Sequence, residues 1–206
     1  MLLFRKTFSY FFKSKKYHTS YFERIINNYK YTDSYLNLFN SLESLKTECK
    51  TSEKITFFND IDFGAHLNRV KSRIKGSFRI VKKIKFIDVL FMEVKLGSYK
   101  FIVELHFFKQ QLVCFRYIFR DQNEKEVFIN LIAKKYFNLK KLDLFNSYVK
   151  DEKSNYIFIE KEVDFSINYI TYEYGFYNYL LESKFEKEID ESLQHEKAIA
   201  ELYDIL

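Results

Sequence analysis

Apolar and polar residues alternate along three consecutive stretches in the middle of the chain. Strict alternation is typical of β-strands that bury one face. Gly97-Ser98 suits a two-residue turn that pairs Leu96 with Tyr99. The pattern therefore predicts three antiparallel strands, which cover residues 84–96, 99–108 and 112–120.

The second turn of this meander sets the register of the third strand. Side chains alternate between the two faces of a sheet, so a slip of one residue exchanges the faces. A three-residue turn, Lys109-Gln110-Gln111, pairs Phe107 with Val113 and puts both apolar rows on one face. Because the opposite face is half apolar, we expect a terminal helix to cover part of it. Its predicted rows are Val89, His106 and Cys114; Phe91, Glu104 and Arg116; Glu93, Ile102 and Ile118; and Lys95, Lys100 and Arg120.

Helical periodicity marks both ends of the chain. Apolar residues three and four positions apart predict helices over 20–48 and 177–206. The first helix is expected to break near Thr32 or Asp33, either of which can cap a new helix. The polar stretch 46–54 is predicted to be a loop.

Two further helices are predicted within the central region. Asp62 can cap a helix that ends at Gly76. Asp121 with Glu124 forms a capping-box-like start to a second helix, which runs to about Tyr136.

A second hairpin is predicted at 155–170, with a three-residue loop at 160–162. The resulting fold class is α+β: an antiparallel sheet of about five strands, formed by a meander plus a hairpin, with packed helices. We expect a single domain over 1–206. It comprises a helical extension at 1–50, an α+β core at 55–172 and an acidic amphipathic helix at 177–206.

Composition narrows the class of protein. The chain is 47% hydrophobic and 20% aromatic, which is enough apolar surface to offset the entropy lost on folding. Its two cysteines, Cys49 and Cys114, do not make a disulfide scaffold and fit a reducing cytoplasm. An aromatic-basic segment at the N-terminus leaves peripheral association with a membrane surface as an alternative.

His106 and Cys114 are the one Cys/His pair that the predicted register brings together, with Glu104 one row away. A nucleophilic pair needs a partly open pocket, whereas a free cysteine in a sheet is commonly buried and inert. The histidines and cysteines lack zinc-ligand spacing, and the four glycines stand alone rather than in a phosphate-binding loop. We therefore predict no enzyme, no cofactor and no metal.

Charge is distributed unevenly. Residues 182–206 carry eight acidic residues against three lysines, whereas residues 69–85 are basic and contain no acid. Such a basic stretch can bind a nucleic-acid backbone, which makes nucleic-acid binding an alternative function. The residues of this alternative are Arg69, Lys71, Arg73, Lys75, Arg79, Lys82 and Lys83.

A second candidate surface lies on the predicted sheet. Like charges directly opposite each other in adjacent strands are destabilising, so the row of Lys95, Lys100 and Arg120 is expected to be solvated, neutralised or bound to a partner. With Glu104 and Arg116, this row forms a hypothetical partner-binding surface. Reversing the charge of Lys100 is then expected to weaken binding without unfolding the protein.

The run FGAHLNRVKSRIKGSF, followed by VLFMEVKLGSYKFIVELHFFKQQLVCFRYIF, resembles the helix and three-stranded meander of BamE and beta-lactamase-inhibitor-protein modules. The resemblance covers roughly residues 60–120. Gly64, Leu67, Val70 and Gly76 fit the pattern, and Phe78 stands where proline is expected. It implies a non-catalytic protein-binding module, such as an inhibitor, an immunity-type protein or an adaptor. A protein partner is therefore expected ahead of nucleic acid and membrane.

Overall fold

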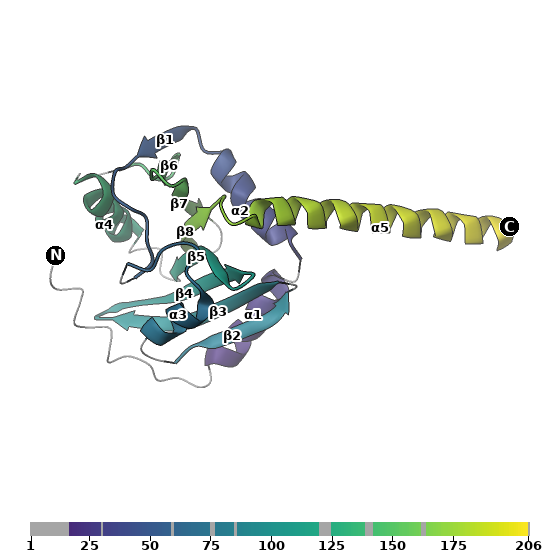
Figure 1. Ribbon diagram of the computed structural model, residues 1–206, viewed down its shortest axis with the longest axis horizontal. Coiled ribbons are helices and arrows are strands. Elements are labelled where there is room, and N and C mark those ends of the chain that lie inside the picture. The colour runs from purple at the N-terminus through teal and green to yellow at the C-terminus, as the bar shows by residue number, and fades with distance from the viewer. Residues whose placement is uncertain are drawn as a thin grey trace.

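One mixed eight-stranded sheet forms the centre of the molecule, with helices on both of its faces (Figure 1). The computed structural model describes residues 17–29, 31–58, 60–74, 77–84, 86–119, 125–138, 142–161 and 164–205. The strand order is β1-β6-β7-β8-β5-β4-β3-β2. The strands are β1 (Thr47–Lys50), β2 (Arg79–Ile84), β3 (Ile87–Leu96), β4 (Tyr99–Phe108), β5 (Gln111–Phe119), β6 (Ser147–Lys150), β7 (Asn155–Lys161) and β8 (Phe165–Thr171).

The broad α+β class is confirmed, but the expectation of about five strands is wrong. The meander and the second hairpin are both present, and β1, β2 and β6 join them in the described part of the chain. β1 lies in the polar stretch that was predicted to be a loop, and it pairs in parallel with β6, Thr47 opposite Ser147. A four-residue strand is too short to show a readable alternation.

Helices divide between the two faces of the sheet. α3 and α4, with the segment after β1, cover one face, whereas α1, α2 and the start of α5 cover the other. The expected cover of the half-apolar face is thus confirmed. The helices are α1 (Tyr17–Asn28), α2 (Asp33–Glu43), α3 (Leu67–Arg73), α4 (Lys125–Phe137) and α5 (Phe176–Ile205).

Helix ends agree with the predictions only in part. The break before α2 is confirmed, with Thr32 at its N-cap position. Asp62 does not cap α3; the His66 ring accepts a hydrogen bond from the Asn68 backbone amide at 3.2 Å instead. Gly76 and the predicted capping box of Asp121 and Glu124 lie outside the described residues.

The register between β4 and β5 differs from the prediction at the turn. Leu96 pairs with Tyr99 as expected, but Phe107 pairs with Leu112 rather than Val113. The turn has two residues, Lys109 and Gln110, with φ of 47° and 70°. Positive φ at both central positions is the type I′ geometry that matches strand twist.

A β-bulge restores the predicted register beyond this turn. The extra residue, Val113, lies between the pairs Phe107–Leu112 and His106–Cys114, so Val113 and Cys114 contribute to the same face. The predicted rows of the opposite face are therefore confirmed apart from Arg120, which lies outside the described residues. In the second hairpin Lys161 pairs with Phe165, so the strands continue past the start of the loop predicted at 160–162; a shift of two residues keeps the same side chains on each face.

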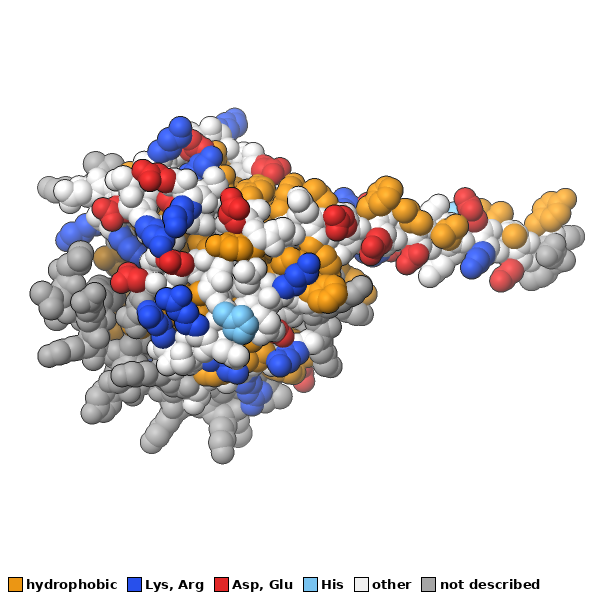
Figure 2. Space-filling view, in the orientation of Figure 1, with side chains coloured by type: hydrophobic (Ala, Val, Ile, Leu, Met, Phe, Trp, Pro, Cys, Tyr) orange, Lys and Arg blue, Asp and Glu red, His pale blue; other side chains and the backbone are white. Residues whose placement is uncertain are grey.

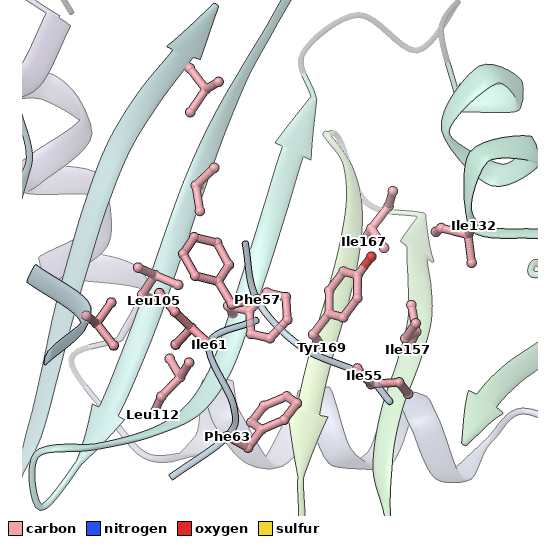
Figure 3. Packing of buried hydrophobic residues seen from close by; sticks show 14 of the residues in the cluster. Ile55, Phe57, Ile61, Phe63, Leu105, Leu112, Ile132, Ile157, Ile167 and Tyr169 are labelled. Atoms are coloured by element: carbon pink, nitrogen blue, oxygen red, sulfur yellow. The ribbon is translucent and has the colours of Figure 1, made fainter. Parts of the chain in front are cut away.

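The more apolar face is closed by the segment between β1 and α3 (Figure 3). Phe57 and Phe63 of this segment each pack on Phe115, with ring centroids 5.3 Å apart. Phe115 stacks in turn on Tyr169 of β8 at 4.3 Å. This layer buries one side of the sheet largely among apolar and aromatic side chains.

Candidate functional site

A buried polar network occupies the sheet face beneath α1 and α2. Glu104 on β4 is 2% exposed. It accepts hydrogen bonds from Tyr21 of α1 at 2.6 Å and from Tyr29, which directly follows α1, at 2.8 Å. An isolated buried carboxylate is strongly destabilising, so these bonds tie α1 to the sheet.

Arg116 on β5 extends the network toward β7 and β8. Its Nη1 donates to the Tyr29 hydroxyl at 2.5 Å and its Nε to the Asn168 side-chain oxygen at 2.5 Å. Its Nη2 donates to Glu160 at 2.9 Å and to Ser166 at 3.2 Å. The guanidinium thus lies close to the carboxylates of Glu104 and Glu160, which compensate its charge, and its side chain is only 13% exposed.

His106 joins the network to α2. Its Nδ1 lies 2.9 Å from the Tyr35 hydroxyl and its Nε2 lies 3.3 Å from Glu104 Oε2. Burial lowers the pKa of His106 against the opposing effect of Glu104, so the ring is neutral near pH 7. The carboxylate can only accept, which assigns the proton to Nε2 and makes Tyr35 the donor to Nδ1.

Glu104 stays ionised at the centre of this network. Burial by itself raises the pKa of the carboxyl, but the hydrogen bond from His106 and the charge of Arg116 outweigh burial and hold the pKa at about 2. Arg116 with Glu104 and Glu160 then forms a compact charged centre inside an apolar surround. Such an arrangement fixes the positions of α1 and α2 on the sheet.

The Tyr35–His106–Glu104 chain has the order of a nucleophile, a base and an orienting acid, but its environment does not support catalysis. Tyr35 and His106 are both fully buried. Cys114 pairs with His106 across the strands as predicted, and burial raises the pKa of its thiol, so the reactive thiolate is suppressed. We interpret the predicted Cys/His pair as part of the core.

The residues predicted to form a binding surface around Lys95 and Lys100 lie partly on the surface and partly beneath α1. The two lysines pair across β3 and β4 and are exposed, and Lys100 forms an ion pair with Glu93 at 3.1 Å, which compensates the charge of Lys100. Glu104 and Arg116 belong to the covered network instead. The predicted residues therefore do not share one accessible surface.

The basic stretch follows α3 and β2. Arg69, Arg73 and Lys82 are exposed, Lys71 and Arg79 are partly exposed, and Lys75 and the Lys83 side chain lie outside the described positions. On the face of the molecule drawn in Figure 2, lysines and arginines are interspersed with acidic side chains rather than gathered in one basic groove. Nucleic-acid binding by this stretch stays a prediction.

The helix predicted over 177–206 is present as α5, but its projection from the body is the least expected feature of the structure. Its first turns are anchored in the body: Phe176 and Leu180 are buried, and the Phe176 ring packs 5.4 Å from Tyr35. Lys187 forms an ion pair with Asp33 of α2 at 3.1 Å. Beyond this contact the helix projects away from the rest of the molecule (Figure 1).

The projecting helix exposes a row of large apolar side chains, which we name the α5 stripe. At 3.6 residues per turn, steps of four rotate by only about 40°, and a residue 18 positions on returns to the same side. The stripe therefore follows one side of the helix, and Figure 2 shows hydrophobic side chains along it. Its members, 44–84% exposed, are Leu181, Phe185, Ile189, Leu193, Ile199, Leu202 and Tyr203.

The periodicity of 177–206 predicted this apolar face but not its exposure. An amphipathic helix normally buries its apolar side. Here both faces of the sheet are already covered by other elements, so the distal turns of α5 have no surface of the body to pack on. One signal in the sequence pointed to this exposure. The chain has more helices with an apolar face than the predicted sheet can cover.

Neither a cluster of metal ligands nor a membrane-spanning helix is found among the described residues. Among them, no group of three or more His, Cys, Asp or Glu side chains is placed to hold a metal ion. No helix in the described part of the chain combines the length and apolar character that crossing a bilayer requires.

Comparison with known proteins returns no relative: no protein family, no curated protein and no solved structure matches this chain. The resemblance of residues 60–120 to BamE and beta-lactamase-inhibitor-protein modules accordingly stays a prediction.

Proposed function

We propose that this protein is a non-catalytic protein-binding module that uses the α5 stripe as its binding surface. The observation that carries the proposal is the exposure of seven large apolar side chains on one side of a helix that projects from a fully formed body. Large contiguous apolar surfaces on folded proteins mark interaction sites. An amphipathic helix placed in an apolar groove is a recurrent mode of protein recognition.

The energetics favour an occupant for the stripe. Complete burial of a Leu, Ile or Phe side chain contributes about 1.5–3 kcal/mol. Stripe residues such as Phe185 and Leu193 are about half exposed or more, so a partner groove regains a substantial part of that free energy from each. A helix that is already formed also avoids the entropic cost of folding on binding.

Charge indicates the chemistry of the partner. Residues 182–206 carry eight acidic residues against three lysines. A groove with an apolar floor and a rim of Lys and Arg complements both properties. A second copy of α5 brings the same negative charge and is disfavoured by repulsion.

The same charge disfavours the two alternative functions for this element. Nucleic-acid phosphates and anionic lipid headgroups are both repelled by an acidic helix. The inhibitor or immunity-type role and the cytoplasmic location are the finer parts of the proposal. The first rests on the resemblance, and the second on the two cysteines, both of which are free.

A matched pair of double variants tests the proposal. The stripe variant is Phe185→Gln with Leu193→Gln; the control is Lys197→Gln with Glu201→Gln, which introduces the same side chains on the polar side without changing net charge. Each is used as affinity bait in native lysate, with and without nuclease, at low and high salt. We expect a protein retained by the wild type and the control to be lost from the stripe variant. Equal recovery on both variants, or recovery of nucleic acid alone, overturns the proposal.

A further inference from the structure

The body of the molecule carries a surface whose charge is opposite to that of α5. This surface is formed by α3 and the start of β2, and we name it the α3–β2 surface. Its basic side chains are exposed or partly exposed, and its apolar side chains are partly exposed. The basic members are Arg69, Lys71 and Lys82, and the apolar members are Ile74, Phe78 and Ile80.

The stretch that forms this surface contains no acidic residue. The nearest acids along the chain are Asp62 and Asp88, and the 25 residues between them include none. Asp62 forms an ion pair with Lys54 at 2.6 Å. Asp88 is 9% exposed and accepts a hydrogen bond from the Gln110 side chain. The stretch therefore brings positive charge to the surface of the body.

The apolar members lie among these basic side chains. Ile74 is the C-cap of α3, and Phe78 and Ile80 lie four and six positions further on, where β2 begins. All three pack against the core cluster that α3 covers, and each keeps part of its side chain at the surface. Apolar side chains bordered by Lys and Arg complement the α5 stripe and its acidic flanks.

We propose that the α5 stripe of one molecule binds the α3–β2 surface of a second copy of this chain. This inference rests on the proposed function, because it names the partner of the α5 stripe. The contact brings an acidic helix to a basic surface, whereas pairing of two α5 helices brings like charges together. Because the two surfaces differ, the interface is heterologous: each molecule gives its α5 to one neighbour and receives the α5 of another.

A molecule cannot make this contact with its own α3–β2 surface. α5 is one continuous helix of 30 residues, about 45 Å long, and its start is fixed by the burial of Phe176 and Leu180. It begins on the sheet face that α1 and α2 cover, whereas α3 lies on the opposite face. Beyond the ion pair of Lys187 with Asp33, α5 points away from the body (Figure 1). The complementary surface must therefore come from another copy.

Two variants that each lose one surface test the proposal by complementation. The stripe variant, Phe185→Gln with Leu193→Gln, keeps the α3–β2 surface. The acceptor variant, Arg69→Glu with Lys82→Glu, keeps the stripe. Neither is expected to associate with itself. An equimolar mixture is expected to form a one-to-one complex, because only one productive contact is left between the two proteins. Sedimentation velocity of the full-length proteins measures the masses.

The wild type and a charge-matched control give the reference behaviour. The mass of the wild type is expected to rise with protein concentration, and less so at high salt, because salt screens exposed charges beyond about 10 Å at 0.1 M. The control, Lys134→Glu with Lys153→Glu, reverses two exposed lysines elsewhere and is expected to associate like the wild type. The acceptor variant is expected to self-associate at least about ten-fold more weakly.

A fold check accompanies both variants. Each must keep the urea midpoint of the wild type. If charge reversal lowers the midpoint, Arg69→Gln with Lys82→Gln replaces it and removes the two positive charges without adding negative ones.

Three outcomes overturn the inference. These are a wild type that stays monomeric up to about 1 mM at low salt, a mixture of folded variants without the one-to-one complex, and an acceptor variant that associates like the wild type. None of them decides the proposed function, because loss of a different captured protein from the stripe variant is measured independently. If that loss is also absent, the proposed function fails as well.

Discussion

The buried network places polar side chains in the interior, whereas the α5 stripe places apolar side chains on the surface. Glu104, His106 and Arg116 are polar groups in the interior, and each is satisfied by partners from neighbouring elements. Phe185 and Leu193 are apolar groups on the surface, about half exposed or more. The buried network contains residue types that are common in catalytic sites, whereas the α5 stripe consists of apolar and aromatic side chains.

The difference separates a structural role from a binding role. Every interaction of the network is internal, so changing it is expected to affect folding. The stripe contributes little to the folded body, so changing it is expected to affect binding alone. Judged by residue type alone, the polar network would be taken for the functional site and the apolar stripe for part of the core.

The largest expected effect concerns Glu104. Glu104→Ala removes the acceptor of Tyr21, Tyr29 and His106 and leaves Arg116 with Glu160 as its remaining carboxylate. Removing one partner of a buried charged pair costs about 3–5 kcal/mol. Urea denaturation measures the loss, with the Lys197→Gln/Glu201→Gln protein as a surface control. A loss below about 1 kcal/mol shows that the network does not hold α1 in place.

Two adjacent leucines of α5 provide a matched comparison within one helix. Leu180 is 0% exposed and Leu181 is 44% exposed. Leu180→Ala is expected to destabilise the protein by about 2–5 kcal/mol, because it creates a cavity in the core. Leu181→Ala is expected to cost about 0.5 kcal/mol or less. Similar losses for both place the distal helix against the body and contradict the exposed stripe.

Acid is expected to weaken the network stepwise. His106 has a folded-state pKa below its ordinary 6.5, so its contribution to stability is present above pH 6.5 and declines as the pH falls below it. Glu104 has its pKa lowered from 4.5 to about 2, so its contribution is lost as the pH falls through that interval. The second step amounts to roughly 3–4 kcal/mol.

Urea midpoints at several pH values measure both steps. In His106→Gln the decline below pH 6.5 should disappear while the Glu104 step remains. Stability that rises on acidification contradicts both assignments.

The smallest expected effect concerns the cysteines. Cys114 is buried with a raised thiol pKa, whereas Cys49 on β1 is partly exposed. A thiol reagent is expected to modify Cys49 rapidly in the native protein and Cys114 only in denaturant. Cys49→Ser should abolish the rapid phase. A fast reaction that survives this substitution means that the region above Cys114 opens readily.

The sequence predicts the parts of this fold that depend on alternation and misses those that depend on packing partners. The rows containing Glu104 and His106 followed from strand parity, which a turn of two residues plus a bulge at Val113 left intact. The turn itself was misassigned because Lys109-Gln110 lacks the glycine or asparagine that usually marks positive φ. β1 was missed because its pairing with β6 is formed across about a hundred residues.

The candidate site was harder to predict than the fold. Alternation placed Glu104 and Arg116 on one face but could not show that α1 covers them. Periodicity found the apolar row from Leu181 to Leu202 but could not show that it faces solvent. The exposure of a helix depends on how much of the sheet the other helices leave uncovered. A local sequence pattern does not report that area.

Site-specific photocrosslinking along α5 tests most directly whether the stripe is the binding surface. A photoreactive phenylalanine analogue is placed at Ile189, in the stripe, or at Gln194, about 140° around the helix. We expect a partner crosslinked from position 189 and not from 194, and loss of that product when Phe185→Gln and Leu193→Gln are added. Equal crosslinking from both positions, or products that persist in the stripe variant, contradicts a binding role for α5.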